Sequence, residues 1–141
     1  MESAPTFLRT MKQFDRNKSL QQLDGQDWGE PTYGSHLVTE CHRLRRVPLR
    51  EFTVEDLRIM IGQHIGVEYL MPLALEHLHA DPLAEGAYYP GDLLAAVLRA
   101  SRQFWQQHPT WRDEVAAIAK RAAPLFSDVE TLQQAYEEFQ K

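Results

Sequence analysis

Apolar residues recur at helical spacing along most of the chain. The clearest stripe, with one serine in it, comprises Leu93, Leu94, Val97, Leu98, Ser101, Phe104 and Trp105. Its members lie three and four residues apart, which is the period of one helix face. Pro90 and Asp92 are typical of a helix start, and Pro109 of a stop. The stripe therefore predicts one long helix that begins near Asp92 and ends before Pro109, with Leu94 and Leu98 on its core face.

Two later stripes predict helices over 111–122 and 129–139. Ser127 and Glu130 have the spacing of a capping box at the start of the second. Together with the helix before Pro109, these two stripes predict three consecutive helices in the C-terminal third. Upstream, a shorter apolar stripe predicts a helix over 37–44, which ends before a proline.

The middle of the chain is apolar on nearly every helix face from Val54 to Leu78. Thr53 and Asp56 cap the start of this stretch. Its interruptions predict two central helices, separated near Gly62, Gly66 or Pro72. Residues 23–35 form a turn-rich connection, and four apolar residues indicate a short N-terminal helix: Phe7, Leu8, Met11 and Phe14. Together the patterns predict an all-α fold, a single compact helical domain over residues 1–141 with about six to eight helices.

The composition of the chain indicates a folded protein and the compartment in which we expect it. Hydrophobic residues make up 43% and charged residues 25% of the chain, as in ordinary folded proteins. Cys41 is the single cysteine, so no intramolecular disulfide forms, and it is expected to be a core thiol. The sequence has no secretory leader and no apolar run long enough to span a bilayer, so we expect a cytoplasmic protein without membrane contact. The net charge of −5 argues against nucleic acid as a partner.

The sequence shows no motif of a catalytic or cofactor site. It lacks the HExxH and CxxC patterns of metal sites and the glycine-rich loops that bind phosphate, so we expect no metal, no cofactor and no enzymatic activity. One alternative is a small hydrolase or metal-dependent enzyme in which folding brings together His64, Glu68, Glu76 and His77. A second alternative is a general helical adaptor or regulator that binds other proteins.

Acidic residues concentrate in the middle of the chain. Residues 51–92 carry eight acidic residues and one basic residue, Arg58. Two loops, within 24–33 and 81–92, also place aromatic residues beside acids, which is typical of protein recognition. The candidate partner-binding residues are Asp27, Trp28, Glu30, Tyr33, Glu55, Asp56, Glu68, Asp81, Glu85, Tyr88, Tyr89 and Asp92. The alternative is that these rings pack inward and the acids cap helices or are solvated. We expect Glu85 and Asp92 to lie near loops, so that reversing their charge leaves the melting temperature almost unchanged.

Three segments, 23–38, 41–78 and 82–94, resemble immunity proteins of bacterial contact-dependent growth inhibition (CDI) systems. The runs VEDLRIMIGQ and EGAYYPGDLL carry the resemblance most specifically. It implies a cytosolic protein, in a cell that makes the toxin, that binds and neutralises the C-terminal toxin domain of a large surface exoprotein. Such toxins are often nucleases, including ribonucleases. The resemblance assigns no contact residue, but an acidic face suits the basic cleft of a nuclease.

Overall fold

The computed structural model describes residues 14–32 and 34–141. Most of the expected N-terminal helix, with Phe7, Leu8 and Met11, lies outside these ranges. The described residues form eight α-helices, two short 3-10 turns and no β-strand, so the all-α prediction is confirmed. The elements are α2 (Leu20–Asp24), α3 (His36–Leu44), η1 (Leu49–Glu51), α4 (Val54–Gly62), α5 (Val67–Ala80), α6 (Asp92–Leu98), α7 (Arg102–Gln107), α8 (Pro109–Ala122), η2 (Ala123–Leu125) and α9 (Glu130–Gln140).

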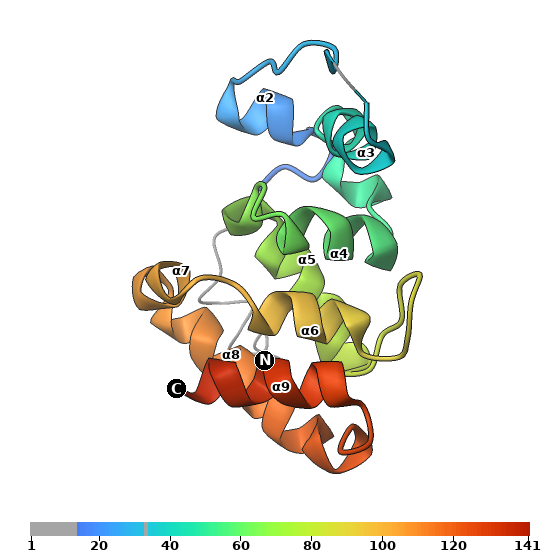
Figure 1. Ribbon diagram of the computed structural model, residues 1–141. Helices are drawn as coiled ribbons and strands as arrows, with labels where there is room; N and C mark the ends of the chain where they lie inside the picture. The colour runs from blue at the N-terminus through green and yellow to red at the C-terminus, as the bar shows by residue number, and fades with distance from the viewer. Residues whose placement is uncertain (1–13, 33) are drawn as a thin grey trace.

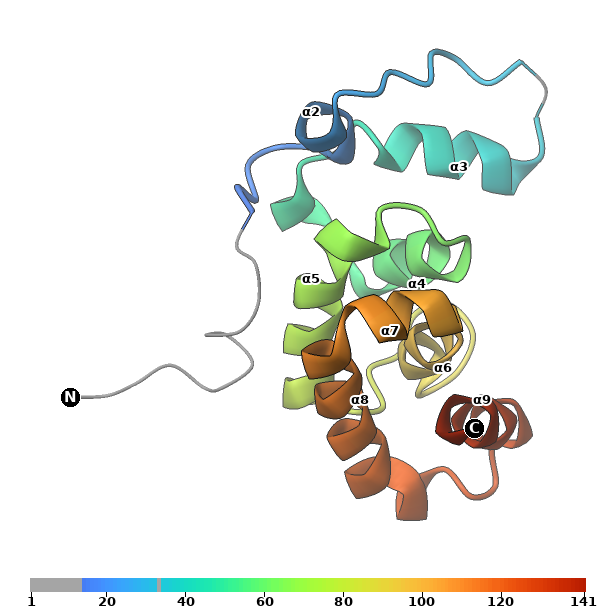
Figure 2. The same ribbon diagram turned by 90° about the vertical axis from the view of Figure 1, so that its left-hand side faces the viewer.

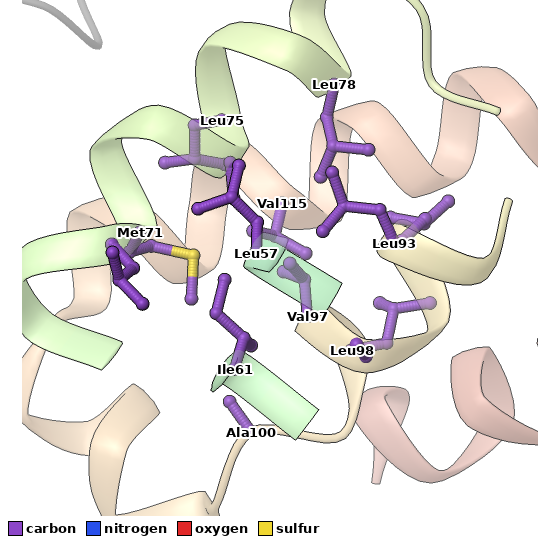
Figure 3. Packing of buried hydrophobic residues seen from close by; sticks show 14 of the residues in the cluster. Leu57, Ile61, Met71, Leu75, Leu78, Leu93, Val97, Leu98, Ala100 and Val115 are labelled. Carbon is purple, nitrogen blue, oxygen red and sulfur yellow. The ribbon is translucent and has the colours of Figure 1, made fainter. Parts of the chain in front are cut away.

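Helix α6 lies at the centre of the fold, and all seven of its residues are buried. It packs against α4, α5, α8 and α9, while α2 and α3 lie beyond α4 at the other end of the molecule (Figures 1 and 2). Figure 3 shows Leu93 and Val97 of α6 among leucines of α4 and α5. Leu94 and Leu98 are 0% and 2% exposed, which confirms their predicted place in the core.

The predicted long helix from Asp92 to Pro109 is wrong, because the chain turns at 99–101 between α6 and α7. Ser101 is the N-cap of α7, and its hydroxyl accepts a hydrogen bond from the backbone N–H of Phe104 at 3.1 Å. Its own backbone N–H donates to Nε2 of His64 at 2.9 Å. A serine that satisfies backbone groups in this way favours a helix start over a helix interior.

The two predicted central helices are present as α4 and α5, and their separation lies at 63–66. Pro72 lies inside α5 without ending it. Gly66 has a φ of 63°, and a Cβ at this position would lie 2.8 Å from the Leu20 side chain. A glycine is therefore required where the chain turns into α5 against α2.

The local start signals are partly confirmed. Thr53 and Asp56 form the capping box of α4. The capping box proposed for Ser127 and Glu130 is wrong, because α9 has Val129 as its N-cap and no side-chain cap. The predicted turn-rich connection begins later than residue 23, since Leu20–Asp24 forms α2.

Cys41 is buried, and burial raises the pKa of its thiol. No helix in the described part of the chain is long and apolar enough to cross a membrane.

Candidate functional site

The loop between α5 and α6 projects from one side of the molecule (Figure 1). A single antiparallel bridge between Glu85 and Pro90 closes it, and the backbone N–H of Gly91 donates to the carbonyl of Leu83 at 3.1 Å. We call residues 81–91 the tyrosine loop, because Tyr88 and Tyr89 lie near its tip.

A buried carboxylate holds the tyrosine loop in place. Asp92, the first residue of α6, is 3% exposed. It accepts hydrogen bonds from the backbone N–H groups of Gly86 at 2.6 Å, Tyr88 at 3.0 Å and Tyr89 at 3.5 Å. A Cβ at Gly86 would lie 2.5 Å from the Glu55 carboxylate, so a larger residue in this position of the loop would have to displace that carboxylate. The expectation that Asp92 is free for charge reversal is therefore wrong: lysine there would remove the acceptor of three backbone N–H groups and bury a positive charge beside Arg58.

A second carboxylate reaches the same loop from α4. Glu55 accepts a hydrogen bond from the backbone N–H of Ala87 at 2.8 Å. It also forms two 2.6 Å hydrogen bonds with Arg58, whose Nε lies 3.8 Å from the Asp92 carboxylate. The guanidinium of Arg58 holds the pKa of Glu55 below its usual range. Two carboxylates and one arginine thus tie the tyrosine loop to α4 and α6.

The two tyrosines of this loop have different surroundings. Tyr88 is 72% exposed, and its ring centroid lies 4.5 Å from the guanidinium carbon of Arg58. Tyr89 is half-buried, and burial raises the pKa of its phenol. Both line a cavity of about 360 Å³ with Arg58 and Arg99. Tyr88 is thus an accessible ring stacked on a cation that is itself held by Glu55.

The second aromatic loop predicted from the sequence lies beside α3, at the far end of the molecule (Figure 1). The Trp28 ring is 41% exposed and lies 4.6 Å from the guanidinium of Arg45 and 5.3 Å from the His42 ring. Arg45 is 2% exposed and forms hydrogen bonds of 2.7 and 2.8 Å with Asp24. These bonds hold the pKa of Asp24 below its usual range. We call residues 25–32 the tryptophan loop.

The acids of the tryptophan loop lie in solvent. Asp27 and Glu30 are exposed, and Arg46 lies 3.8 Å and 2.8 Å from them. Tyr33 lies outside the described residues. The prediction that aromatic rings and acids meet on this loop therefore holds for Trp28, Asp27 and Glu30, although both acids face Arg46, in the turn after α3.

The remaining predicted acids divide into two kinds. Asp56 serves the N-cap of α4 and lies 3.9 Å from Arg43. Glu68, Asp81 and Glu85 are exposed. The acidic run is thus part structural and part surface.

The residues of the alternative enzyme site are used separately. His64 accepts a hydrogen bond from Ser101, and Glu76 forms an ion pair with Arg16. Among the described residues, no three His, Cys, Asp or Glu side chains are grouped so as to hold a metal ion.

Sequence reasoning missed the role of Arg58. It was noted as the one cation of an acidic run, whereas the structure places it under the exposed ring of Tyr88. Its position three residues after Glu55 is the spacing of a helical ion pair, and that signal points to the salt bridge but not to the ring.

Exposed aromatic rings on two loops of a helical domain, each beside charged side chains, are typical of a protein-binding domain. The sequence model of one family, described as CDI immunity proteins, matches residues 22–115, about two-thirds of the chain. The chain therefore belongs to the CDI immunity protein family. The matched range includes both aromatic loops and ends within α8. A comparison with curated proteins found no match.

Proposed function

We propose that this protein binds the toxin domain of its own CDI system and neutralises it by occlusion, without changing it chemically. The observation that carries the proposal is the exposed ring of Tyr88 on a loop whose backbone is fixed by Asp92 and Glu55. A loop that is ordered before binding loses little conformational entropy on association, and an aromatic side chain on it is a favourable anchor.

The proposed toxin-facing surface is centred on the tyrosine loop. Its charge comes from the exposed carboxylates of Asp81 and Glu85 in this loop. Glu68 is also exposed, but it lies in the first turn of α5, at the opposite end of that helix, and is a separate candidate. The tryptophan loop, with Asp27, Trp28 and Glu30, is a second and separate candidate. Glu55 and Asp92 hold the tyrosine loop by hydrogen bonds to its backbone, and Asp56 caps the start of α4, so these three carboxylates are engaged within the fold.

We propose that the toxin is a nuclease. An enzyme that acts on a polyanion needs a basic cleft, and an acidic, aromatic surface is complementary to it. This charge complementarity should show in kinetics: Glu85→Lys should slow association at low salt, and the difference from wild type should fade as salt shortens the Debye length below about 10 Å.

The test is to mix the protein with the toxin domain encoded in the same CDI locus. We expect a stable complex by size-exclusion chromatography, unchanged masses of both chains, and loss of toxin activity at a one-to-one ratio. A toxin that is cleaved or covalently modified would show that the protein is an enzyme, and a toxin that stays active and unbound would exclude the proposed partner.

A further inference from the structure

A second cavity, of about 620 Å³, lies where the end of α6, α7, the start of α8 and the end of α9 meet. Four cations line it: Arg99, Arg102, Arg112 and Lys141. Residues 93–141 contain six basic and six acidic residues, yet Glu138 is the one acid in the lining. Folding has therefore gathered most of the positive charge of a neutral segment around one pocket, which we call the cationic pocket.

Among the described residues, the arginines of the cationic pocket have no carboxylate partner. Lys141 lies 3.1 Å from Glu138. Arg99 donates a 3.4 Å hydrogen bond to the carbonyl of Thr131, and the guanidinium of Arg112 lies 5.1 Å from the Phe139 ring centroid. Within residues 14–32 and 34–141, no carboxylate oxygen lies within 4.0 Å of Arg99, Arg102 or Arg112. Three positive charges are thus available to a ligand.

The rest of the lining limits what that ligand is. Leu98, Trp105, Pro109 and Phe139 supply apolar walls between the cations. A ligand that fits must bring carboxylates for the arginines and apolar groups for these walls, which is the chemistry of an acidic peptide segment. Nucleic acid fits less well, because the protein carries a net charge of −5 and Glu138 lies in the lining. A volume of this size accommodates several side chains.

The cationic pocket adjoins the tyrosine loop. Arg99 lines both this pocket and the smaller cavity formed with Tyr88 and Tyr89. A partner seated on the tyrosine loop therefore lies next to the pocket. We infer that the cationic pocket binds an acidic segment of the same toxin, so that the toxin-facing surface has an acidic part at the loop and a basic part at the pocket. This inference rests on the proposed function.

The test compares two charge reversals that change net charge equally. Arg102 is exposed and is the first residue of α7, where a glutamate is favourable to the helix, so Arg102→Glu should fold. Lys120 is exposed on α8 outside the pocket, so Lys120→Glu is the matched control. We expect Arg102→Glu to weaken binding of the toxin domain by about tenfold, with Lys120→Glu within about twofold of wild type. Circular dichroism melts of both variants check that the fold is kept.

The outcomes separate this inference from the proposed function. If wild type binds the toxin and Arg102→Glu binds it equally well, or if both variants weaken it equally, the inference is wrong and the proposed function stands. If wild type does not bind the toxin, both are wrong. Inorganic phosphate that displaces the toxin beyond the effect of chloride at equal ionic strength would indicate a phosphate site and overturn the inference. Self-association of the free protein that Arg102→Glu abolishes while toxin binding stays unchanged would assign the pocket to a second copy instead.

Discussion

The tyrosine loop and the tryptophan loop both place an aromatic ring beside an arginine and carboxylates, but their backbones are held in different ways. In each, the guanidinium carbon of an arginine lies at a similar distance from an aromatic ring centroid: 4.5 Å for Arg58 and Tyr88, and 4.6 Å for Arg45 and Trp28. In the tyrosine loop, four backbone N–H groups donate to carboxylates of α4 and α6. In the tryptophan loop, the backbone N–H groups of Gln26 and Gly29 donate to acids only two residues away, and Arg45 donates to Asp24 and to the carbonyl of Gln26.

The difference shows that acids near an aromatic residue have separate tasks. Asp92 is 3% exposed and holds the backbone of the tyrosine loop, whereas Asp27 is exposed, accepts one hydrogen bond from the backbone N–H of Gly29 two residues away, and lies 3.8 Å from Arg46. Buried carboxylates of the first kind should matter for folding, and exposed ones of the second kind only for association. Mutations that separate stability from binding test this division.

The largest expected effect is on the core that carries the tyrosine loop. Leu94→Ala and Leu98→Ala should each lower the free energy of unfolding by about 2–5 kcal/mol, because both side chains are buried in α6. Leu125, 68% exposed, is the control, and Leu125→Ala should lie within about 0.5 kcal/mol of wild type. Urea unfolding measures all three. A leucine variant of α6 that melts like wild type yet loses toxin binding would show that our core assignment is wrong.

The next effect compares the two acids directly. Asp92→Ala should lower the free energy of unfolding by about 2–3 kcal/mol, because three backbone N–H groups lose their acceptor and Arg58 loses a nearby charge. Asp27→Ala should change it by less than about 0.5 kcal/mol, since its ion pair with Arg46 and its hydrogen bond from Gly29 are both exposed to water. Equal losses in thermal melts would contradict the division between structural and surface acids.

A smaller, pH-dependent effect is expected at Glu55. Its pKa is lowered in the folded protein by Arg58, so its carboxylate stabilises the fold above its usual pKa, and this contribution is lost as pH falls through the lowered value. Wild type should therefore be more stable than Glu55→Gln at pH 7, and the two should converge between about pH 5 and pH 3. Asp24 has the same lowered pKa in both proteins, so its contribution cancels. A stability difference that does not change over this range would exclude an ionised Glu55 as the cause.

The smallest effect is expected at the edge of the tryptophan loop. Glu30 and Arg46 form an ion pair of 2.8 Å with both side chains largely in solvent. Glu30→Ala should change the free energy of unfolding by less than about 0.5 kcal/mol, and the difference should decline with added salt. A loss of more than about 1 kcal/mol in the free energy of unfolding would show that this ion pair holds the tryptophan loop in place, as Asp92 holds the tyrosine loop.

The elements that could be predicted from sequence are those fixed by neighbours in the chain. The capping box of Thr53 and Asp56 and the apolar period over 111–122 depend on residues within one or two turns, and both are present in the structure. The break after α6 could not be predicted, because Ser101 has the spacing of the apolar stripe. The side chain that accepts a hydrogen bond from its backbone N–H, His64, is 37 residues away.

The same reasoning applies to the candidate site. The sequence places acids and tyrosines together in 81–92, but the hydrogen bond from Ala87 to Glu55 spans 32 residues. Only folding shows that Glu55 and Asp92 point inward while Glu85 stays in solvent. The cationic pocket is lined by residues of α6, α7, α8 and α9, so no local sequence pattern predicts it.

The central claim is that the tyrosine loop is the element that binds the toxin, and the dissociation rate of the toxin complex tests it most directly. Tyr88→Ala should speed dissociation by at least about 30-fold, equivalent to about 2 kcal/mol, while its melting temperature stays near that of wild type because the ring is 72% exposed. Tyr88→Phe, which keeps the ring over Arg58, and Leu125→Ala, which removes an exposed apolar side chain elsewhere, should dissociate at nearly the wild-type rate. A Tyr88→Ala complex that dissociates as slowly as wild type would contradict the claim.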